Sequence, residues 1–138
     1  MKRILVTASH SKMADGLKES LDFVSGGVQQ TIALSAYLDN RPLQDTVDEL
    51  MKGFADEDEV VVLTDLTSGS VNQQFFRYRN REHTHIVSGM NLPLALLIAM
   101  EPQGEYITTE RMRQMVEEAQ SEMKYVNDLV DDGDDEDE

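Results

Sequence analysis

Residues 59–65 read Glu-Val-Val-Val-Leu-Thr-Asp and form the clearest strand pattern in the chain. The residues from Val60 to Leu63 are all apolar, whereas a strand with one wet face alternates apolar and polar residues. Both faces of such a strand have to be covered, which is typical of a central strand in a parallel sheet. Parallel neighbours need crossover connections, usually helices. The segments on either side of residues 59–65 should therefore supply further strands and helices.

Three other short apolar runs are predicted to be strands, at residues 3–8, 28–34 and 84–88. The segments between and after them carry apolar residues at helical spacing, which predicts helices. These helices are expected near residues 13–24, 41–54, 71–79 and 91–100, and from 108 onward. Gly26-Gly27 should end the first helix, and Asn40 should cap the second, with Pro42 in its first turn.

Two apolar faces are conspicuous in these predicted helices. The face of the first helix consists of Met13, Leu17, Leu21 and Val24. The last helix has a longer stripe, which we assign to the core or to a dimer contact: Met112, Met115, Val116, Ala119, Met123 and Val126.

Strands that alternate with helices over 138 residues predict one α/β domain. The expected fold is a three-layer sandwich. Its central, mainly parallel four-stranded sheet has the order 2-1-3-4, and helices cover both faces.

The net charge of the chain is strongly negative and unevenly placed. Twelve basic residues face 27 acidic ones, a formal charge of −15, which argues against nucleic-acid binding. Residues 128–138 carry eight of the acidic residues and no basic residue, and without them the charge is −7. A run of like charges with nothing to bury predicts a disordered tail. We therefore expect residues 1–127 to form the folded domain.

Cysteine is absent, which excludes disulfides, thiolate metal sites and a cysteine nucleophile. The apolar runs are far shorter than the roughly 18 residues that a membrane-spanning helix needs. The first 20 residues carry acidic and polar groups where a signal peptide has its apolar core. These features predict a cytoplasmic protein without membrane insertion.

Ligands of open parallel sheets bind at the carboxyl ends of the strands, where the strand order reverses. In the expected sheet this point lies between strands 1 and 3, which end in Ser9-His10-Ser11 and Asp65-Leu-Thr-Ser-Gly-Ser70. A carboxylate that accepts a hydrogen bond from Nδ1–H of a histidine leaves Nε2 bare, as a base, nucleophile or ligand. His10 and Asp65 are the predicted pair. An ordinary polar loop histidine with a capping aspartate is the alternative.

The surroundings of this pair suit an anion. A helix begins after each of the two segments, and helix N-termini offer unpaired N–H groups and partial positive charge. A nucleophilic imidazole beside such a cradle indicates a phosphohistidine. The predicted phosphate-binding residues are Ser11, Ser68, Gly69 and Ser70.

Three blocks of the sequence resemble one family: VTASHSKMADGL at 6–17, VVLTDLTSGSV at 61–71 and VSGMNLPL at 87–94. In this order and spacing they are similar to the enzyme IIA domain of the mannose-type sugar phosphotransferase system (PTS). The resemblance implies that His10 accepts a phosphoryl group from the phosphocarrier HPr on Nε2. It also implies that Asp65 orients the ring and that the Ser70 hydroxyl reaches the phosphoryl oxygens, without a metal or other cofactor.

The resemblance further implies partners and some departures from the family pattern. His10 would pass the group to a IIB subunit, which serves the membrane subunits IIC and IID. The family usually has glycine where Ser68 stands and proline where Val71 stands. Family members are homodimers that exchange a short C-terminal strand. In this chain such a strand would have Val126, Leu129 and Val130 to pack, so the exchange stays open.

Two alternatives use the same chemistry: the phosphotransfer subunit of a dihydroxyacetone kinase, and a regulatory IIA-like domain outside transport. A receiver or flavin-binding module is disfavoured, because a receiver needs an acidic cluster where Ser9-His10-Ser11 stands. The Thr67–Ser70 loop lacks the lysine and spacing of a Walker loop. No G-x-S-x-G elbow is present, which argues against a serine hydrolase.

Three further features have simpler explanations than a binding site. His83 and His85 share a strand face, but two ligands without a third are weak evidence for a metal. Arginines at 77, 79 and 81 are expected to interact with a helix C-terminus. Asn91 and Pro93 are expected to shape a loop and cap the following helix.

Overall fold

The computed structural model describes residues 1–130, which form a four-stranded parallel sheet with the order β2-β1-β3-β4. The strands are β1 (Arg3–His10), β2 (Thr31–Ala36), β3 (Glu59–Thr64) and β4 (Thr84–Ser88). The helices are α1 (Met13–Ser25), α2 (Leu43–Lys52), α3 (Ser70–Phe76), α4 (Leu92–Ala99) and α5 (Thr109–Ser121), followed by a 3₁₀ turn at Val126–Asp128. The predicted α/β fold and strand order are confirmed.

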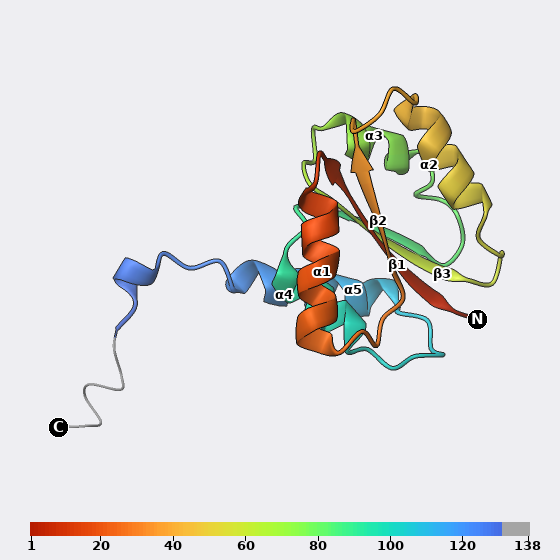
Figure 1. Cartoon of the computed structure of the whole chain (residues 1–138). Coiled ribbons are helices and arrows are strands. Elements are labelled where there is room, and N and C mark those ends of the chain that lie inside the picture. The colour runs from red at the N-terminus through yellow and green to blue at the C-terminus, as the bar shows by residue number, and fades with distance from the viewer. Residues whose placement is uncertain (131–138) are drawn as a thin grey trace.

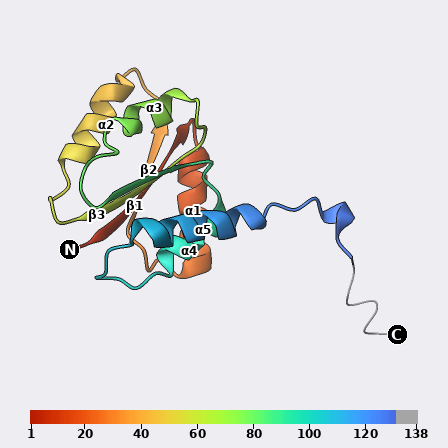
Figure 2. The ribbon, with the colours of Figure 1, turned by 180° about the vertical axis from the view of Figure 1, so that it is seen from behind.

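Helices cover the sheet on both faces, as Figures 1 and 2 show from opposite sides. On one face α1, α4 and α5 pack through Leu21, Ile98 and Met115. On the other face α2 and α3 pack through Val47 and Phe75. All six residues of β3 are buried, which confirms the prediction made from the unbroken apolar run at residues 60–63.

Register places the carboxyl ends of β1 and β3 side by side. Ala8 pairs with Thr64, the last residue of β3. Asp65, which follows Thr64, therefore lies next to the last two residues of β1. On the other side of β1, His10 pairs with Ala36 at the end of β2. The carboxyl ends of β1, β2 and β3 thus lie together at one end of the sheet, which Figure 1 shows at the tips of the β1 and β2 arrows.

Several predicted boundaries are wrong. The second strand begins at Thr31 rather than Val28, which is 58% exposed. The buried side chain of Gln29 donates to the main-chain oxygens of Arg3 and Gln30 and holds the chain outside the sheet there. The third helix ends at Phe76 and the last at Ser121, so that Met123 is 90% exposed.

Two local predictions about helices also fail. Asn40 does not cap the second helix, because Pro42 occupies the N-cap position. In α1 the buried face passes through Ala14 and Leu21, and it leaves Met13 and Val24 exposed. Gly26, with φ of 75°, ends α1 as predicted, by donating its N–H to Asp22. The domain boundary after 127 stays a prediction, and most of the acidic tail lies outside the described residues.

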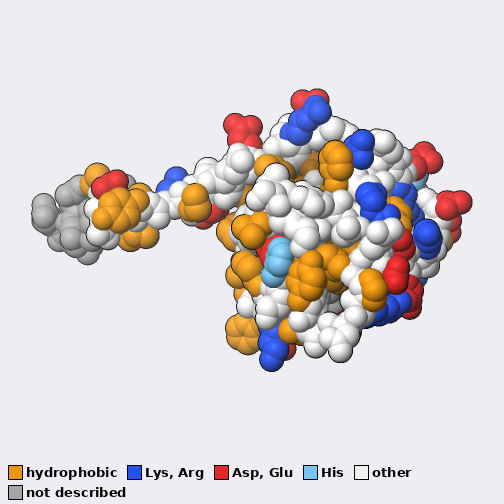
Figure 3. All heavy atoms as spheres, turned by 90° about the horizontal axis from the view of Figure 1, so that it is seen from above, with side chains coloured by type: hydrophobic (Ala, Val, Ile, Leu, Met, Phe, Trp, Pro, Cys, Tyr) orange, Lys and Arg blue, Asp and Glu red, His pale blue; other side chains and the backbone are white. Residues whose placement is uncertain are grey.

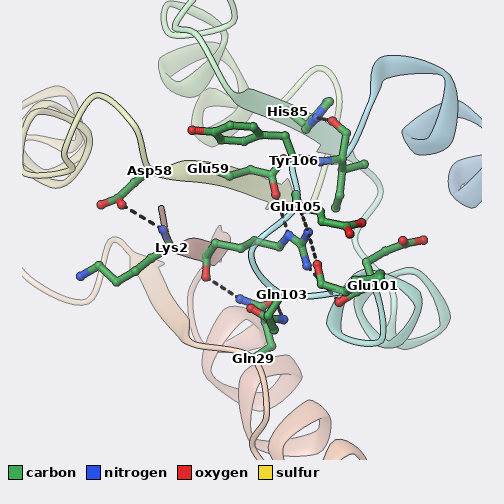
Figure 4. A network of polar contacts seen from close by, with 12 residues as sticks. Lys2, Gln29, Asp58, Glu59, His85, Glu101, Gln103, Glu105 and Tyr106 are labelled. Atoms are coloured by element: carbon green, nitrogen blue, oxygen red, sulfur yellow. Dashed lines mark hydrogen bonds and ion pairs between the residues drawn. The ribbon is translucent and has the colours of Figure 1, made fainter.

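A buried ion pair fastens the amino-terminal edge of the sheet (Figure 4). The Arg3 side chain is 1% exposed, and its Nε donates to Oε1 of Glu59 at 2.6 Å. The other carboxylate oxygen of Glu59 accepts the N–H of Ile107 at 2.6 Å. The Arg3 guanidinium also donates to the main-chain oxygens of Glu101, Pro102 and Glu105. This network ties the α4–α5 connection to the first residues of β1 and β3.

We expect Arg3→Met to destabilise the protein by about 3–5 kcal/mol, because it leaves the Glu59 carboxylate buried without its cation. Urea denaturation at pH 7 measures the loss as a change in the free energy of unfolding. The control is Lys18→Met, which removes an exposed pair with Asp22 and should cost less than about 1 kcal/mol. Equal effects of the two substitutions would contradict this account.

Candidate functional site

His10 is the last residue of β1, and Asp65 follows the last residue of β3. One carboxylate oxygen of Asp65, Oδ2, accepts two hydrogen bonds from His10: from the backbone N–H at 2.8 Å and from Nδ1 at 2.7 Å. The other oxygen accepts the N–H of Leu66 at 2.9 Å. The predicted pair is therefore assembled, and the carboxylate holds both the backbone and the ring of the histidine.

The carboxyl group of Asp65 is ionised at neutral pH. Burial alone would raise its pKa, but the hydrogen bonds from His10 and Leu66 outweigh burial and hold the pKa below its ordinary value. An ionised Asp65 can only accept a hydrogen bond, so the neutral ring has its proton on Nδ1 and Nε2 is the bare nitrogen. The Asp65 side chain is 9% exposed and that of His10 is 39% exposed, so a partner can reach the ring.

Nε2 of His10 faces the hydroxyl of Ser70, the first residue of α3, at 3.3 Å. The Ser70 hydroxyl lies 2.6 Å from the phenolic oxygen of Tyr37, directly after β2. Sequence reasoning missed Tyr37, because it ended the second strand at Leu34. An aromatic residue at the carboxyl end of a strand beside β1 was the signal that could have revealed it.

Gly69 lies against the imidazole ring. A Cβ at this position would stand 3.0 Å from Cε1 of His10 and 3.2 Å from Cβ of Leu66. A side chain at residue 69 would therefore push the ring away from Asp65 or Ser70. The structure gives this predicted phosphate-binding residue a steric reason to be glycine.

Neighbouring side chains fix the loop between β3 and α3. Thr64 donates its hydroxyl to the side-chain oxygen of Asn72 at 2.8 Å. Asn72 in turn donates its amide to the main-chain oxygen of Thr67 at 3.0 Å. Gln73 donates to the main-chain oxygen of Ser68 at 3.3 Å, and the Thr67 hydroxyl bonds to that of Ser88. These bonds fix the loop that leads into Ser70.

The two remaining predicted phosphate-binding residues lie further out. Ser11 has φ of 55°, and its N–H donates to the main-chain oxygen of Ala36 at 3.0 Å. Among the described residues no hydrogen bond joins the side chain of Ser11 or Ser68 to His10. Ser9 belongs to the predicted Ser9-His10-Ser11 segment but had no role assigned from the sequence; its hydroxyl accepts the N–H of Ala14 at 2.7 Å and anchors the start of α1.

The other residues considered from the sequence have structural partners. His85 bonds to the main-chain oxygen of Ile107 at 2.8 Å, and His83 stacks on Tyr106. Within residues 1–130 no three side chains are grouped as metal ligands. Asn91 accepts the N–H of Leu94 at 2.8 Å, which confirms its predicted role as a helix cap.

The predicted arginine cluster disperses. Arg79 donates to the main-chain oxygen of Phe76 at the end of α3, as expected. Arg77 pairs with Asp48 at 2.7 Å, and Arg81 donates to main-chain oxygens in the segment before β3.

Hydrophobic side chains gather at the end of the molecule that Figure 3 shows, on either side of an exposed histidine side chain. Large apolar residues near the site in the chain are more than half exposed: Met13, Tyr37, Leu38 and Leu66. The ring of Tyr37 lies beside that of His10, with centroids 5.5 Å apart. The surface around the exposed imidazole is therefore partly apolar, which suits contact with a protein partner.

Comparison with known proteins places these features in a family. The chain matches the EIIA-man family, described as the PTS system fructose IIA component, over residues 4–114. No curated protein sequence matches the chain. No helix among residues 1–130 is long and apolar enough to cross a membrane.

Three solved structures show the similarity of the fold. A protein of Klebsiella pneumoniae, described as a phosphoenolpyruvate-dependent sugar PTS permease, is 34% identical, with 93% of each chain covered and a TM-score of 0.84. A PTS IIA protein associated with the fucose utilization operon of Streptococcus pneumoniae is 26% identical, with coverage of 92% and 95% and a TM-score of 0.69. The mannose/sorbose-specific IIA subunit of Enterococcus faecalis is 22% identical, with coverage of 95% and 98% and a TM-score of 0.77.

The low pKa of Asp65 makes its contribution to stability dependent on pH. A carboxylate with a depressed folded-state pKa stabilises the protein above its unfolded pKa of about 4, and the contribution is lost as the pH falls through the folded-state value. We expect Asp65→Asn to lower the free energy of unfolding most above about pH 5, and less with each step below pH 4. Urea denaturation between pH 2.5 and 6 measures the difference, and a difference that stays constant would contradict the assignment.

Proposed function

We propose that this chain, which belongs to the EIIA-man family of PTS IIA components, carries a phosphoryl group on Nε2 of His10. The family gives it a phosphotransfer role in a sugar PTS. We infer further that the group comes from phospho-HPr and goes to a IIB subunit during sugar uptake. One observation carries the proposal: Asp65 holds the Nδ1 side of an exposed imidazole and leaves Nε2 facing a hydroxyl and solvent.

The transfer is a displacement at phosphorus. The lone pair of His10 Nε2 forms a bond to phosphorus while the donor's phosphorus–nitrogen bond breaks, and the electron pair of that bond returns to the donor ring. No proton has to leave Nε2, because Asp65 already selects the tautomer with the proton on Nδ1. Positioning and stabilisation of charge on the equatorial oxygens therefore supply the catalysis.

Asp65 also balances the charge of the product. A ring that keeps the proton on Nδ1 and gains phosphorus on Nε2 becomes cationic, and the Asp65 carboxylate lies 2.7 Å from Nδ1. The hydroxyl of Ser70 is close enough to Nε2 to donate to a phosphoryl oxygen there. Ser11, Ser68 and Gly69 complete the proposed phosphate-binding edge, with Gly69 acting through the position of the ring.

Two partners have to use the same surface in turn, since a carrier is loaded by one protein and unloaded by another. The exposed imidazole with its partly apolar surroundings suits such exchange. The acidic chain favours partners with basic residues around their own histidine, mainly through faster encounter. We place the protein in the cytoplasm, serving the membrane subunits IIC and IID through IIB.

The blocks SGS at 68–70 and GMNLP at 89–93 resemble the transport family more than the phosphotransfer subunit of a dihydroxyacetone kinase, which favours transport. A regulatory IIA-like protein would use the same His10 chemistry, so delivery to the cognate IIB subunit separates the two roles. A regulator would accept the phosphoryl group without passing it to a sugar.

We also propose a homodimer. In residues 1–130, β4 is an edge strand, and a groove of about 550 Å³ lies beside it between α4 and α5, lined by Val87, Met90, Leu94, Val116 and Ala119. The segment after α5 exposes five large apolar side chains within eight residues: Met123, Tyr125, Val126, Leu129 and Val130. This segment runs away from the body of its own chain in Figures 1 and 2, so a second copy would supply its cover.

Incubation with phosphoenolpyruvate, enzyme I and HPr should add one acid-labile phosphoryl group to the wild-type chain, seen by intact mass. His10→Ala should abolish the label, because the accepting nitrogen is gone. Asp65→Asn should keep the fold and slow loading roughly tenfold to a hundredfold, the range for a lost charge-assisted hydrogen bond.

The matched control is His83→Ala, at the opposite end of the sheet, which should load like the wild type. Full label on His10→Ala, or no label on the wild type, would refute the phosphohistidine. Addition of the cognate IIB should then remove the label from His10.

Light scattering coupled to size exclusion should give the wild type twice its chain mass of 15.6 kDa. A chain that ends at Val130 loses seven acidic residues and Gly133, but none of the apolar residues, and should stay dimeric. A chain that ends at Glu122 loses the exposed apolar segment and should become monomeric. A monomeric wild type, or a dimeric chain ending at Glu122, would contradict this arrangement.

A further inference from the structure

Three polar groups form a line that ends on the reactive nitrogen. The phenolic oxygen of Tyr37 lies 2.6 Å from the Ser70 hydroxyl, which lies 3.3 Å from Nε2 of His10. The opposite nitrogen of the same ring is bonded to Asp65 at 2.7 Å. Tyr37 follows β2, Ser70 begins α3 and His10 ends β1, so the line joins three elements.

The groups at the two ends of this line decide which atom donates in each of its hydrogen bonds. Asp65 is ionised, so it accepts from Nδ1, and Nε2 has a free lone pair that accepts from Ser70. Ser70 has a single hydroxyl proton and uses it to donate the hydrogen bond to Nε2. Its oxygen can therefore only accept a hydrogen bond from Tyr37. Tyr37 is therefore the donor in the 2.6 Å contact with Ser70.

We propose that Tyr37 is a positioning residue that fixes the Ser70 hydroxyl with its proton toward Nε2, where the phosphoryl group is received. This inference deepens the proposed function and rests on it for its use in transfer. A serine hydroxyl without a second partner rotates among its staggered positions. A donor on the far side of its oxygen selects the position in which the proton points at the ring.

During transfer the same arrangement serves the phosphoryl group. As Nε2 gives its lone pair to phosphorus and the donor's phosphorus–nitrogen bond breaks, Nε2 stops accepting from Ser70. The Ser70 proton then turns to a phosphoryl oxygen at the same place, while Tyr37 continues to donate to the Ser70 oxygen. No proton is gained or lost in this step.

The backbone of Tyr37 is held in an uncommon conformation, with φ of 67°. A bulky residue in this left-handed region is strained and persists where the surroundings fix it. Its ring also forms one side of the site, 5.5 Å from the imidazole centroid. Tyr37→Phe removes the hydroxyl and keeps the ring. It therefore tests the hydrogen bond to Ser70 without removing the side of the site that the ring forms or its contact with a partner.

The first measurement is the ¹⁵N resonance of His10 Nε2 in the free protein at neutral pH. A nitrogen that accepts a hydrogen bond resonates upfield of one that does not. Tyr37→Phe should move Nε2 downfield, and Ser70→Ala should move it further. The double variant should match Ser70→Ala. The control is Tyr106→Phe, which loses a 2.7 Å bond to the main-chain oxygen of Glu57 away from the site and should leave the resonance unchanged.

The second measurement is the rate of loading from phospho-HPr. Tyr37→Phe should lower kcat by about three- to tenfold, the range for one neutral hydrogen bond, and leave KM unchanged. In the Ser70→Ala background the same substitution should have no further effect on kcat. Tyr106→Phe should load like the wild type.

An unchanged Nε2 resonance in Tyr37→Phe would overturn the positioning role, and so would a change confined to KM, which would make Tyr37 a docking contact. The resonance is read without any phosphoryl donor. A wild type that takes no label would therefore refute the proposed function. The Nε2 resonance tests separately whether Tyr37 positions the Ser70 hydroxyl toward His10.

Discussion

The site depends on one carboxylate oxygen that accepts two hydrogen bonds from the same residue. Oδ2 of Asp65 binds the backbone N–H and the ring Nδ1 of His10, so the ends of β1 and β3 and the orientation of the imidazole are set together. Ladder pairing between these strands stops at Ala8 and Thr64, and the Asp65 side chain extends it to His10. Both bonds require β1 and β3 to be neighbours, which the strand order 2-1-3-4 provides.

The fold and the central pair could be predicted because each rests on a local signal. The unbroken apolar run of residues 60–63 indicates a doubly covered strand, and alternating strands and helices leave few topologies. His10 and Asp65 follow from the rule that chemistry gathers where the strand order reverses, because both directly end predicted strands. Three family blocks then assign them roles, and these blocks end strands 1, 3 and 4.

The rest depends on contacts between segments far apart in the chain, which leave no periodic signal. Arg3 and Glu59 are charged residues at the starts of strands, and nothing local indicates that both are buried and bonded to the α4–α5 connection. Tyr37 directly follows β2, and sequence propensity ended that strand two residues too early, at residue 34. Gly69 is fixed by the imidazole of a residue 59 positions away in the chain, a steric limit that composition cannot show.

The two sides of the imidazole are built from different chemical groups, and the difference fits a carrier. On the Nδ1 side stands a carboxylate that can accept the hydrogen bond from Nδ1–H whether or not the ring is loaded. On the Nε2 side stand hydroxyls, which both donate and accept and can turn between a nitrogen lone pair and an oxygen. A cation on that side would bind the phosphoryl group more strongly than an exchangeable cargo needs, since a charge-assisted bond is roughly twice as strong as a neutral one. A hydroxyl can bond to Nε2 in the empty ring and to a phosphoryl oxygen in the loaded one, which suits the proposed receipt from one partner and release to the next.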